Sequence, residues 1–253
     1  MKKELKEILG LGLIMAKTNF KLKNEGTFLG ILWYLITPLI TFLLLLGIFE
    51  DRLGQNIPNY PLYLLLGILI FNYVNRIASE SIRLLKQNNE IIKSINFRKE
   101  ALVINVLFTN LFMHFFEIII LILFLIFFKI SIISMILYPL ILFIISTFAL
   151  GLGLFLSSIE IYFVDLKNLW GFFSKAIWFL TPIFYTIGGQ TKLRILNYLN
   201  PMYYLITFAR DIIIYSKLPS NEILFGTFFF TAFFIILGTI LFRKLNKKFA
   251  ELV

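Results

Sequence analysis

The sequence predicts an all-α integral membrane protein with six transmembrane helices, and three observations lead to that fold class. First, 59% of the 253 residues are hydrophobic, whereas soluble domains stay close to half. Second, residues 28–49 carry no charge, and a helix of that length rises about 33 Å, enough to cross a bilayer core. Third, most Lys and Arg residues fall in alternate segments between the apolar runs. We therefore expect one multi-span domain over residues 1–253.

The segment 1–27 is expected to be an amphipathic helix at the membrane surface. Its apolar residues recur every three or four positions, with lysines between them, which is typical of interfacial helices. Docking of a cytoplasmic partner is the alternative role. The first long apolar run starts too late for a cleavable signal peptide and favours a signal anchor. The apolar positions are Leu5, Ile8, Leu9, Leu13, Ala16 and Phe20.

The first two spans are expected at residues 28–49 and 60–78, joined by an external hairpin that carries only Arg52 as a basic residue. Pro38 should kink the first span because it lacks an N–H donor. The hydroxyls of Thr37 and Thr41 are then available to the carbonyls that the proline frees.

Residues 79–100 are polar and basic, with apolar residues between the charges. Asn88 and Asn89 interrupt the middle of the segment. The pattern predicts two short amphipathic helices on the cytoplasmic side.

The third and fourth spans are expected at 101–128 and 130–157, with a tight external turn at Lys129 and Ser131. The third is longer than a bilayer requires, which indicates tilt or an extramembrane end. Gly151 and Gly153 allow another helix to approach the fourth span closely. Residues 158–168 return the chain to the cytoplasm.

The fifth and sixth spans are expected at 169–187 and 223–242. The external segment 188–222 between them is too apolar for water, so we expect it to re-enter the bilayer against protein. This topology leaves 18 of the 24 Lys and Arg residues inside, which favours cytoplasmic termini. Four of the external ones fall in the re-entrant segment: Lys192, Arg194, Arg210 and Lys217.

Few residues offer catalytic chemistry. The chain has no cysteine, a single histidine and no GxxxxGK[ST] loop, so it cannot hydrolyse ATP by itself. The net charge of +10 is spread over segments between spans, which argues against a nucleic-acid surface. His114 and Glu117 share one face of the third span, where a carboxylate costs about 3 kcal/mol. They either face a translocation path or lock a helix contact.

Five motifs together resemble the permease subunit of ABC-2-type exporters. They are EGTFLGILWYLITP, with Leu29, Gly30, Trp33 and Pro38; IIKSINF at 91–97; YFVDL with Asp165; TPIFY at 181–185; and LNPMYYLITFARD at 199–211. The similar branch exports polysaccharides and polyol phosphates, including O-antigen, capsule and teichoic acid. The resemblance covers the chain in order. Arg98 stands where the family often has proline, and Val164 where it often has arginine.

The resemblance implies a six-span half-transporter that forms a homodimer in the cytoplasmic (inner) membrane and exports a lipid-linked polysaccharide. Two copies of a separate ABC ATPase subunit would carry ATP and Mg²⁺, so this chain would bind no cofactor or metal and would not be an enzyme. Segments 1–27 and 79–100 would receive the ATPase stroke, and the segment before the last span would form two re-entrant helices.

The site residues that follow from this reading fall in two groups. Those expected to couple to the ATPase are Glu90, Ile92, Lys93, Phe97, Arg98 and Asp165. Those expected at the channel or its gate are His114, Glu117, Tyr185, Asn200, Pro201, Tyr203, Arg210 and Asp211. Arg210 and Asp211 would form an ion pair or meet a diphosphate-linked substrate.

Three other functions remain as alternatives. An ABC-2 permease for teichoic acid, a lipid or a small hydrophobic drug would share the fold and the partner. A membrane enzyme acting on polyprenyl-linked sugars requires clustered acids, and the 14 acids here are scattered. A secondary transporter requires inverted repeats and paired intramembrane charges, which the sequence lacks.

Overall fold

The computed structural model describes residues 2–25, 30–95, 97–163, 165–187 and 191–246, and in these ranges every regular element is helical. Leu29 and Val164, which the sequence motifs include, lie outside the described residues, as do the side chains of Leu5 and Lys192. Five helical stretches are long and apolar enough to cross a membrane, so the chain is a multi-pass membrane protein. Their helices are α2 (Trp33–Phe49), α3 (Tyr60–Ser81), α6 (Glu100–Phe127), α7 (Tyr138–Glu160) and α11 (Asn221–Leu245).

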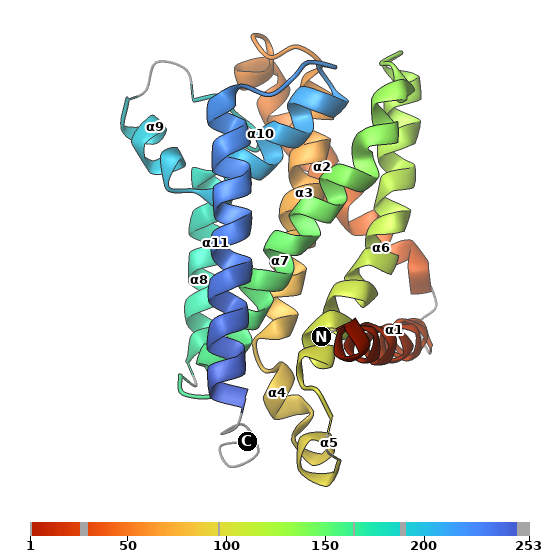
Figure 1. The fold of residues 1–253 in the computed structure, drawn as a ribbon. Helices are drawn as coiled ribbons and strands as arrows, with labels where there is room; N and C mark the ends of the chain where they lie inside the picture. The colour runs from red at the N-terminus through yellow and green to blue at the C-terminus, as the bar shows by residue number, and fades with distance from the viewer. Residues whose placement is uncertain (1, 26–29, 96, 164, 188–190, 247–253) are drawn as a thin grey trace.

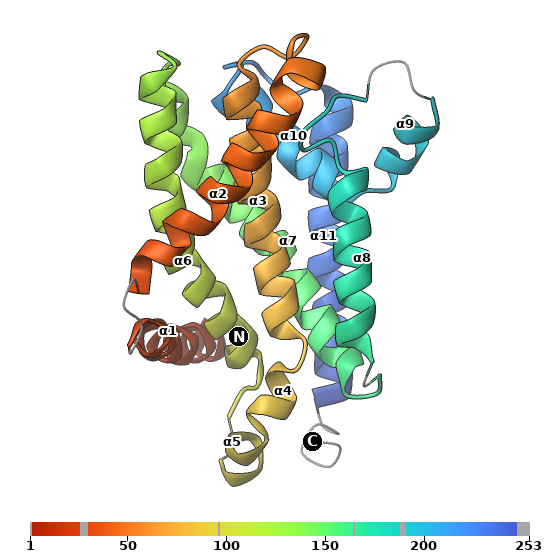
Figure 2. The ribbon, with the colours of Figure 1, turned by 180° about the vertical axis from the view of Figure 1, so that it is seen from behind.

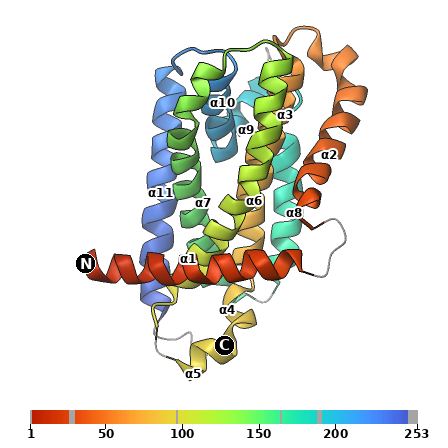
Figure 3. The same ribbon diagram turned by 90° about the vertical axis from the view of Figure 1, so that its right-hand side faces the viewer.

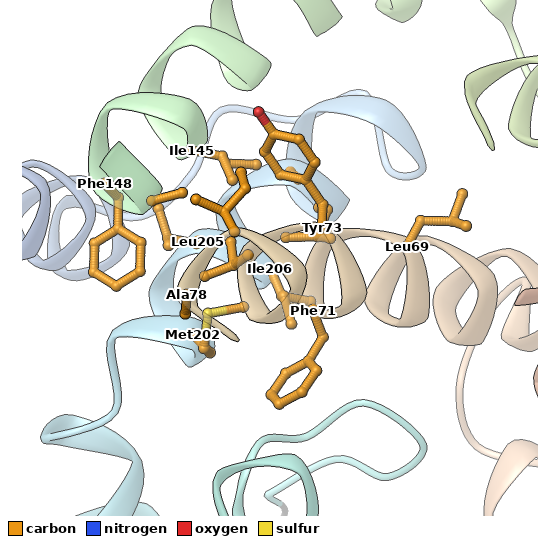
Figure 4. Close-up of a cluster of buried hydrophobic side chains, with 14 of the residues drawn as sticks. Leu69, Phe71, Tyr73, Ala78, Ile145, Phe148, Met202, Leu205 and Ile206 are labelled. Carbon is orange, nitrogen blue, oxygen red and sulfur yellow. The ribbon is translucent and has the colours of Figure 1, made fainter. Parts of the chain in front are cut away.

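These helices run side by side as a bundle (Figure 1). α3 is its central member, because 78% of the residues in its apolar stretch are buried, against 11% for the stretch that contains α2. Figure 4 shows Phe71 and Tyr73 of α3 among Ile145 and Phe148 of α7 and Leu205 of the shorter α10 (Pro201–Ile213). The core therefore lies between α3, α7 and α10.

α7 and α11 pack nearly backbone to backbone. A Cβ atom at Gly151 would lie 2.4 Å from the Ile235 amide nitrogen, and one at Gly238 would lie 2.2 Å from the Gly151 carbonyl oxygen. Such distances leave no room for a side chain, so both positions need glycine. The close approach that the sequence predicts at Gly151 is confirmed.

The N-terminal helix α1 (Lys2–Asn24) lies crosswise over one end of the bundle (Figure 3). Ile8 packs against Ala101 and Ile104 of α6, and Ala16 is also buried. α4 (Leu84–Gln87) and α5 (Asn89–Ser94) project beyond the same end (Figure 1). The two short helices expected between the second and third spans are thus present, and the Asn88 side chain closes α4 by donating to the Leu84 carbonyl at 2.7 Å.

The first span differs from its prediction at both ends and in the hydrogen bonding near Pro38. A short 3-10 turn, η1 (Gly30–Leu32), precedes α2, and a π-helical turn, η2 (Glu50–Gly54), follows it. The Thr41 hydroxyl donates to the Thr37 carbonyl at 3.1 Å. The carbonyl that Pro38 leaves without a donor is that of Tyr34, four residues earlier, so this bond does not serve it.

The predicted end of the fifth span is wrong. The helix found there, α8 (Leu166–Leu180), stops before Thr181, whose backbone is extended at ψ 134°. Pro182 disfavours helical geometry at the residue before it, and it carries no N–H to continue the ladder. At 15 residues, α8 rises about 22 Å, less than the ~30 Å of a hydrocarbon core.

The segments at the end of the bundle opposite α1 complete the fold. The turn at Lys129 has a left-handed φ of 55°, and the 3-10 turn η3 (Ile132–Leu137) follows it. Two short helices, α9 (Thr191–Tyr198) and α10, precede α11. Asn200 caps α10, since its side chain accepts from the Met202 amide at 3.0 Å and Pro201 occupies the first turn.

Candidate functional site

A buried polar network joins α3, α6 and α7 in the middle of the bundle. The two oxygens of the Glu117 carboxylate are both used: one accepts from Arg76 Nη1 at 2.7 Å and the other lies 2.6 Å from His114 Nδ1. His114 and Glu117 are each only 1% exposed. The pair expected on one face of the third span is thus formed, and Arg76 of α3 joins it.

The second nitrogen of His114 extends the network to α7. Nε2 lies 2.8 Å from the Tyr138 hydroxyl, and the Tyr73 ring centroid is 4.7 Å from that of His114. A carboxylate beside Nδ1 and a hydroxyl beside Nε2 therefore give both ring nitrogens of His114 a hydrogen-bond partner. The enclosed geometry favours the helix-locking alternative over a group open to a translocation path.

The same network continues to the end of the bundle that carries α1. Arg76 Nε donates to Asn110 at 3.3 Å, and Asn110 donates to Glu80 at 3.1 Å. The other Glu80 oxygen accepts from Lys23 of α1 at 2.7 Å. Sequence reasoning missed Glu80 and the role of Arg76. The available signal was a basic residue at the end of one apolar span together with an acidic residue in the next span.

Arg210 forms a second buried centre, at the opposite end of the bundle. Its side chain is 2% exposed, and its guanidinium donates to three backbone carbonyls. Nε and Nη2 donate to Tyr63 at 3.1 and 2.8 Å, Nη1 to Pro182 at 2.7 Å, and Nη2 also to Ile183 at 2.9 Å. The guanidinium carbon lies 3.3 Å from the Tyr63 ring centroid, a cation–π contact.

Arg210 binds α3 through the Tyr63 carbonyl, and it binds the non-helical stretch after α8, residues 181–185, through the carbonyls of Pro182 and Ile183. Two tyrosine hydroxyls also donate to this stretch: that of Tyr63 to Pro182 and Tyr185 at 2.9 and 2.8 Å, and that of Tyr60 to Phe184 at 2.9 Å. Irregular backbone among apolar spans requires this shielding by protein. We call Arg210, Tyr63 and residues 181–185 the arginine clamp.

Gly67 provides the space for the clamp. A Cβ atom at this position of α3 would lie 2.5 Å from Arg210 Nη2. Asp211, next to the clamp, pairs with Lys217 at 3.1 Å. Arg210 and Asp211, both described by the structure, do not form an ion pair with each other, so the first of the two alternatives that the sequence left for them is wrong. Sequence reasoning also missed Tyr63 and Gly67, which look like ordinary span residues.

Three of the channel candidates meet at one cavity of about 240 Å³, which Tyr203, Arg210 and Asp211 line together with Tyr63 and Tyr215. Tyr185 lies elsewhere, since its hydroxyl donates to the Leu180 carbonyl at 2.7 Å and so closes the end of α8. Asn200 and Pro201 start α10, and the Asn200 amide also donates to the Thr181 hydroxyl at 2.8 Å.

The coupling candidates gather at the end that carries α1. Glu90 and Lys93 are exposed on α5, while Ile92 is buried. Phe97 packs on the core, and Arg98 pairs with Glu4 of α1.

Two further contacts shape this end of the molecule. Asp165 is exposed before α8, and its side chain does not cap that helix. Lys86 of α4 pairs with Glu160 of α7 at 2.9 Å, so α4 is fixed to a long helix.

Burial lowers the pKa of Lys99, whose ammonium donates to the Asn246 carbonyl at 3.2 Å.

Comparison with known proteins adds two findings. A family described as ABC-2 type transporter matches residues 12–214. A protein named O-antigen export system permease protein RfbA from Myxococcus xanthus is 25% identical over 253 residues, which cover 98% of this chain and 97% of that protein. A protein of the same name from Klebsiella pneumoniae is 25% identical over 258 residues, covering all of this chain and 98% of its own length.

Proposed function

The chain belongs to the ABC-2 type transporter family and is a membrane subunit of a transporter, and from this premise we propose that it exports a lipid-linked polysaccharide of the O-antigen type. The observation that carries the proposal is the similarity along the whole chain to permeases that are named for O-antigen export. An ATPase subunit is the partner that this family implies. The permease itself supplies the membrane path.

We propose that the energy of ATP hydrolysis enters at the end formed by α1, α4 and α5. α5 presents exposed charges there, at Glu90 and Lys93, while Ile92 holds the helix to the core. The ion pair between Arg98 and Glu4 joins the start of α6 to α1. A push on α5 would therefore reach both a spanning helix and the crosswise helix.

The proposed topology has six spans, with α8 as a short fifth one and with α1, α4 and α5 in the cytoplasm. In support, α8 packs against α3, where the ring centroids of Phe71 and Trp178 are 4.9 Å apart, and the basic residues of α4, α5 and the end of α11 lie at one end of the molecule (Figure 1). α9 and α10 would then re-enter the membrane from outside. A homodimer in the cytoplasmic membrane, with two ATPase subunits, completes the proposed assembly.

The assembly is tested by co-expression with a candidate ABC ATPase subunit from the same organism, capture through this subunit, and measurement of ATP hydrolysis. We expect stable capture and activity only in the pair. A matched control carries a Walker-motif substitution in the ATPase, which should be captured but inactive. A chain that purifies as a monomer and captures no ATPase would contradict the half-transporter assembly.

The cargo is tested separately, in cells that lack this chain but still make the polysaccharide. Return of the polysaccharide to the cell surface on re-expression is expected, with intracellular lipid-linked polymer accumulating in its absence. A chain that assembles with an active ATPase but leaves the polymer inside would refute O-antigen export and retain the transporter assembly.

A further inference from the structure

A polar cleft of about 370 Å³ lies where α1, α3, α4 and α6 meet, at the end of the bundle where we propose that the ATPase acts. Figure 2 shows these helices together at the end of the bundle where α8 also begins. The lining is polar and its charge is mostly positive. Its hydrogen-bonding side chains include Asn19, Lys23, Arg83, Gln87, Asn105 and Lys167.

The walls of the cleft are fixed by contacts that tie α1 to the bundle. Asn19 donates to Asn105 of α6 at 3.2 Å, and Lys23 donates to Glu80 of α3 at 2.7 Å. Glu80 is the one carboxylate among the described lining residues, and Lys23 balances its charge. The positive charge of Arg83 and Lys167 is therefore left uncompensated within the cleft.

Arg83 and Lys167 are both exposed. Within the part of the chain that the structure describes, neither side chain takes part in a hydrogen bond or an ion pair. Arg83 also has a φ of 68°, in the left-handed region that glycine and asparagine adopt far more readily than long side chains. An arginine held in such a backbone conformation is typical of a functional position.

The depth of the cleft suggests the kind of anion that it meets. α1 crosses the end of the bundle (Figure 3), and the apolar part of α3 gives way to Asn75 and Arg76 just before the cleft. Lipid headgroups lie at this boundary. A guanidinium fork beside an ammonium and carboxamides is a donor set that suits phosphate oxygens.

We infer that this cleft binds the phosphate or diphosphate group of a membrane lipid, with Arg83 and Lys167 as its main ligands. Asn19 and Gln87 supply neutral donors beside them. The inference concerns the phosphate chemistry of the cleft alone, so it holds whichever cargo the transporter carries. A different cargo would leave it intact, and a failure here would leave the proposed assembly intact.

The chain contains its own reporter for this site. Trp170 Nε1 donates to the Ser79 hydroxyl at 3.1 Å, and Ser79 lines the cleft. Replacing Trp33 and Trp178 by phenylalanine leaves Trp170 as the single tryptophan of the three. The purified full chain in neutral detergent is then titrated with dioctanoyl phosphatidate, and we expect a saturable change in Trp170 emission. Dioctanoylglycerol, which lacks the phosphate, should cause none.

Two variants test the ligands. Arg83→Asn and Lys167→Gln should each weaken phosphatidate binding about tenfold, the loss expected for one charge-assisted hydrogen bond. Asparagine tolerates the left-handed backbone, so Arg83→Asn should not lower the melting temperature. The exposed cations Lys129 and Lys175 lie outside the cleft, and their glutamine variants should bind as the parent does.

Unchanged affinity in Arg83→Asn, or an equal response to dioctanoylglycerol, would overturn the inference. Pyrophosphate that binds as tightly as phosphatidate would overturn the lipid as its source. Loss of ATPase capture in both variants with phosphatidate binding intact would assign the cations to a protein interface and also overturn it. Saturable binding of phosphatidate or farnesyl diphosphate supports it, and the tighter ligand identifies the lipid class.

Discussion

The substitution Gly67→Ala tests the arginine clamp directly. An added Cβ would lie 2.5 Å from Arg210 Nη2, so the guanidinium would have to move by about 1 Å to reach ordinary contact. The end of an arginine side chain usually moves easily, but this one is held by bonds to three carbonyls. The two bonds of Nη2, to Tyr63 and Ile183, are the ones placed at risk.

The expected loss follows from those bonds. A hydrogen bond that involves a charged group contributes about 1.5–3 kcal/mol, so losing both costs about 3–6 kcal/mol. Replacing a helical glycine by alanine returns about 1 kcal/mol. We therefore expect Gly67→Ala to lower the free energy of unfolding by about 2–5 kcal/mol.

Unfolding by SDS in mixed micelles, followed by tryptophan fluorescence, measures this change. Thiol-reactive dyes do not report here because the chain has no cysteine. Gly10→Ala is the matched control, since a Cβ at Gly10 on α1 would meet nothing within 4 Å, and it should stabilise slightly.

A double-mutant cycle isolates the effect of the close contact between the added Cβ atom and Arg210. In an Arg210→Lys background Nη2 is gone and the tightest remaining neighbour of the added Cβ is Ile183 Cγ2 at 3.3 Å, so Gly67→Ala should destabilise the protein far less. The two substitutions are therefore strongly non-additive if the clamp exists as described. Additive effects, or a Gly67→Ala variant as stable as Gly10→Ala, would refute the reasoning.

Three further predictions concern packing, the buried network and coupling. Gly151→Ala should destabilise by about 3 kcal/mol or more, because the added atom meets α11 backbone, whereas Gly171→Ala, with nothing within 4 Å, should stabilise slightly in the same SDS assay. Glu117→Gln should cost about 3–5 kcal/mol because it leaves Arg76 without its anion, whereas Glu90→Gln at an exposed site should stay within about 0.5 kcal/mol; equal losses would contradict the network. Lys93→Glu should reduce ATPase activity of the captured pair without changing stability, and unchanged activity would exclude Lys93 from the coupling surface.

The sequence predicts the helices of this chain well, because their signals are local. The charge-free stretches mark the long helices, and Asn200 before Pro201 marks the start of α10. The end of α8 could have been predicted from the same kind of local signal, because a proline follows Thr181. Its position was missed because apolar composition continues through residues 183–187.

The candidate site is less accessible from sequence because its contacts join distant residues. Arg210 is 147 residues from Tyr63, and Arg76 is 41 from Glu117. The spacing of His114 and Glu117 predicts their shared face, but nothing local indicates that Arg76 completes the pair. Likewise, Arg210 and Asp211 are adjacent in sequence, yet consecutive helical side chains point in different directions, so each finds another partner.

The arginine clamp also bears on the order in which the chain matures during synthesis. Pro182 and Ile183 are synthesised before Arg210, which follows Pro182 by 28 residues. Until α10 arrives, their carbonyls lack the guanidinium that satisfies them, and unsatisfied backbone is costly in lipid. The arginine clamp therefore stays incomplete until translation has passed residue 210.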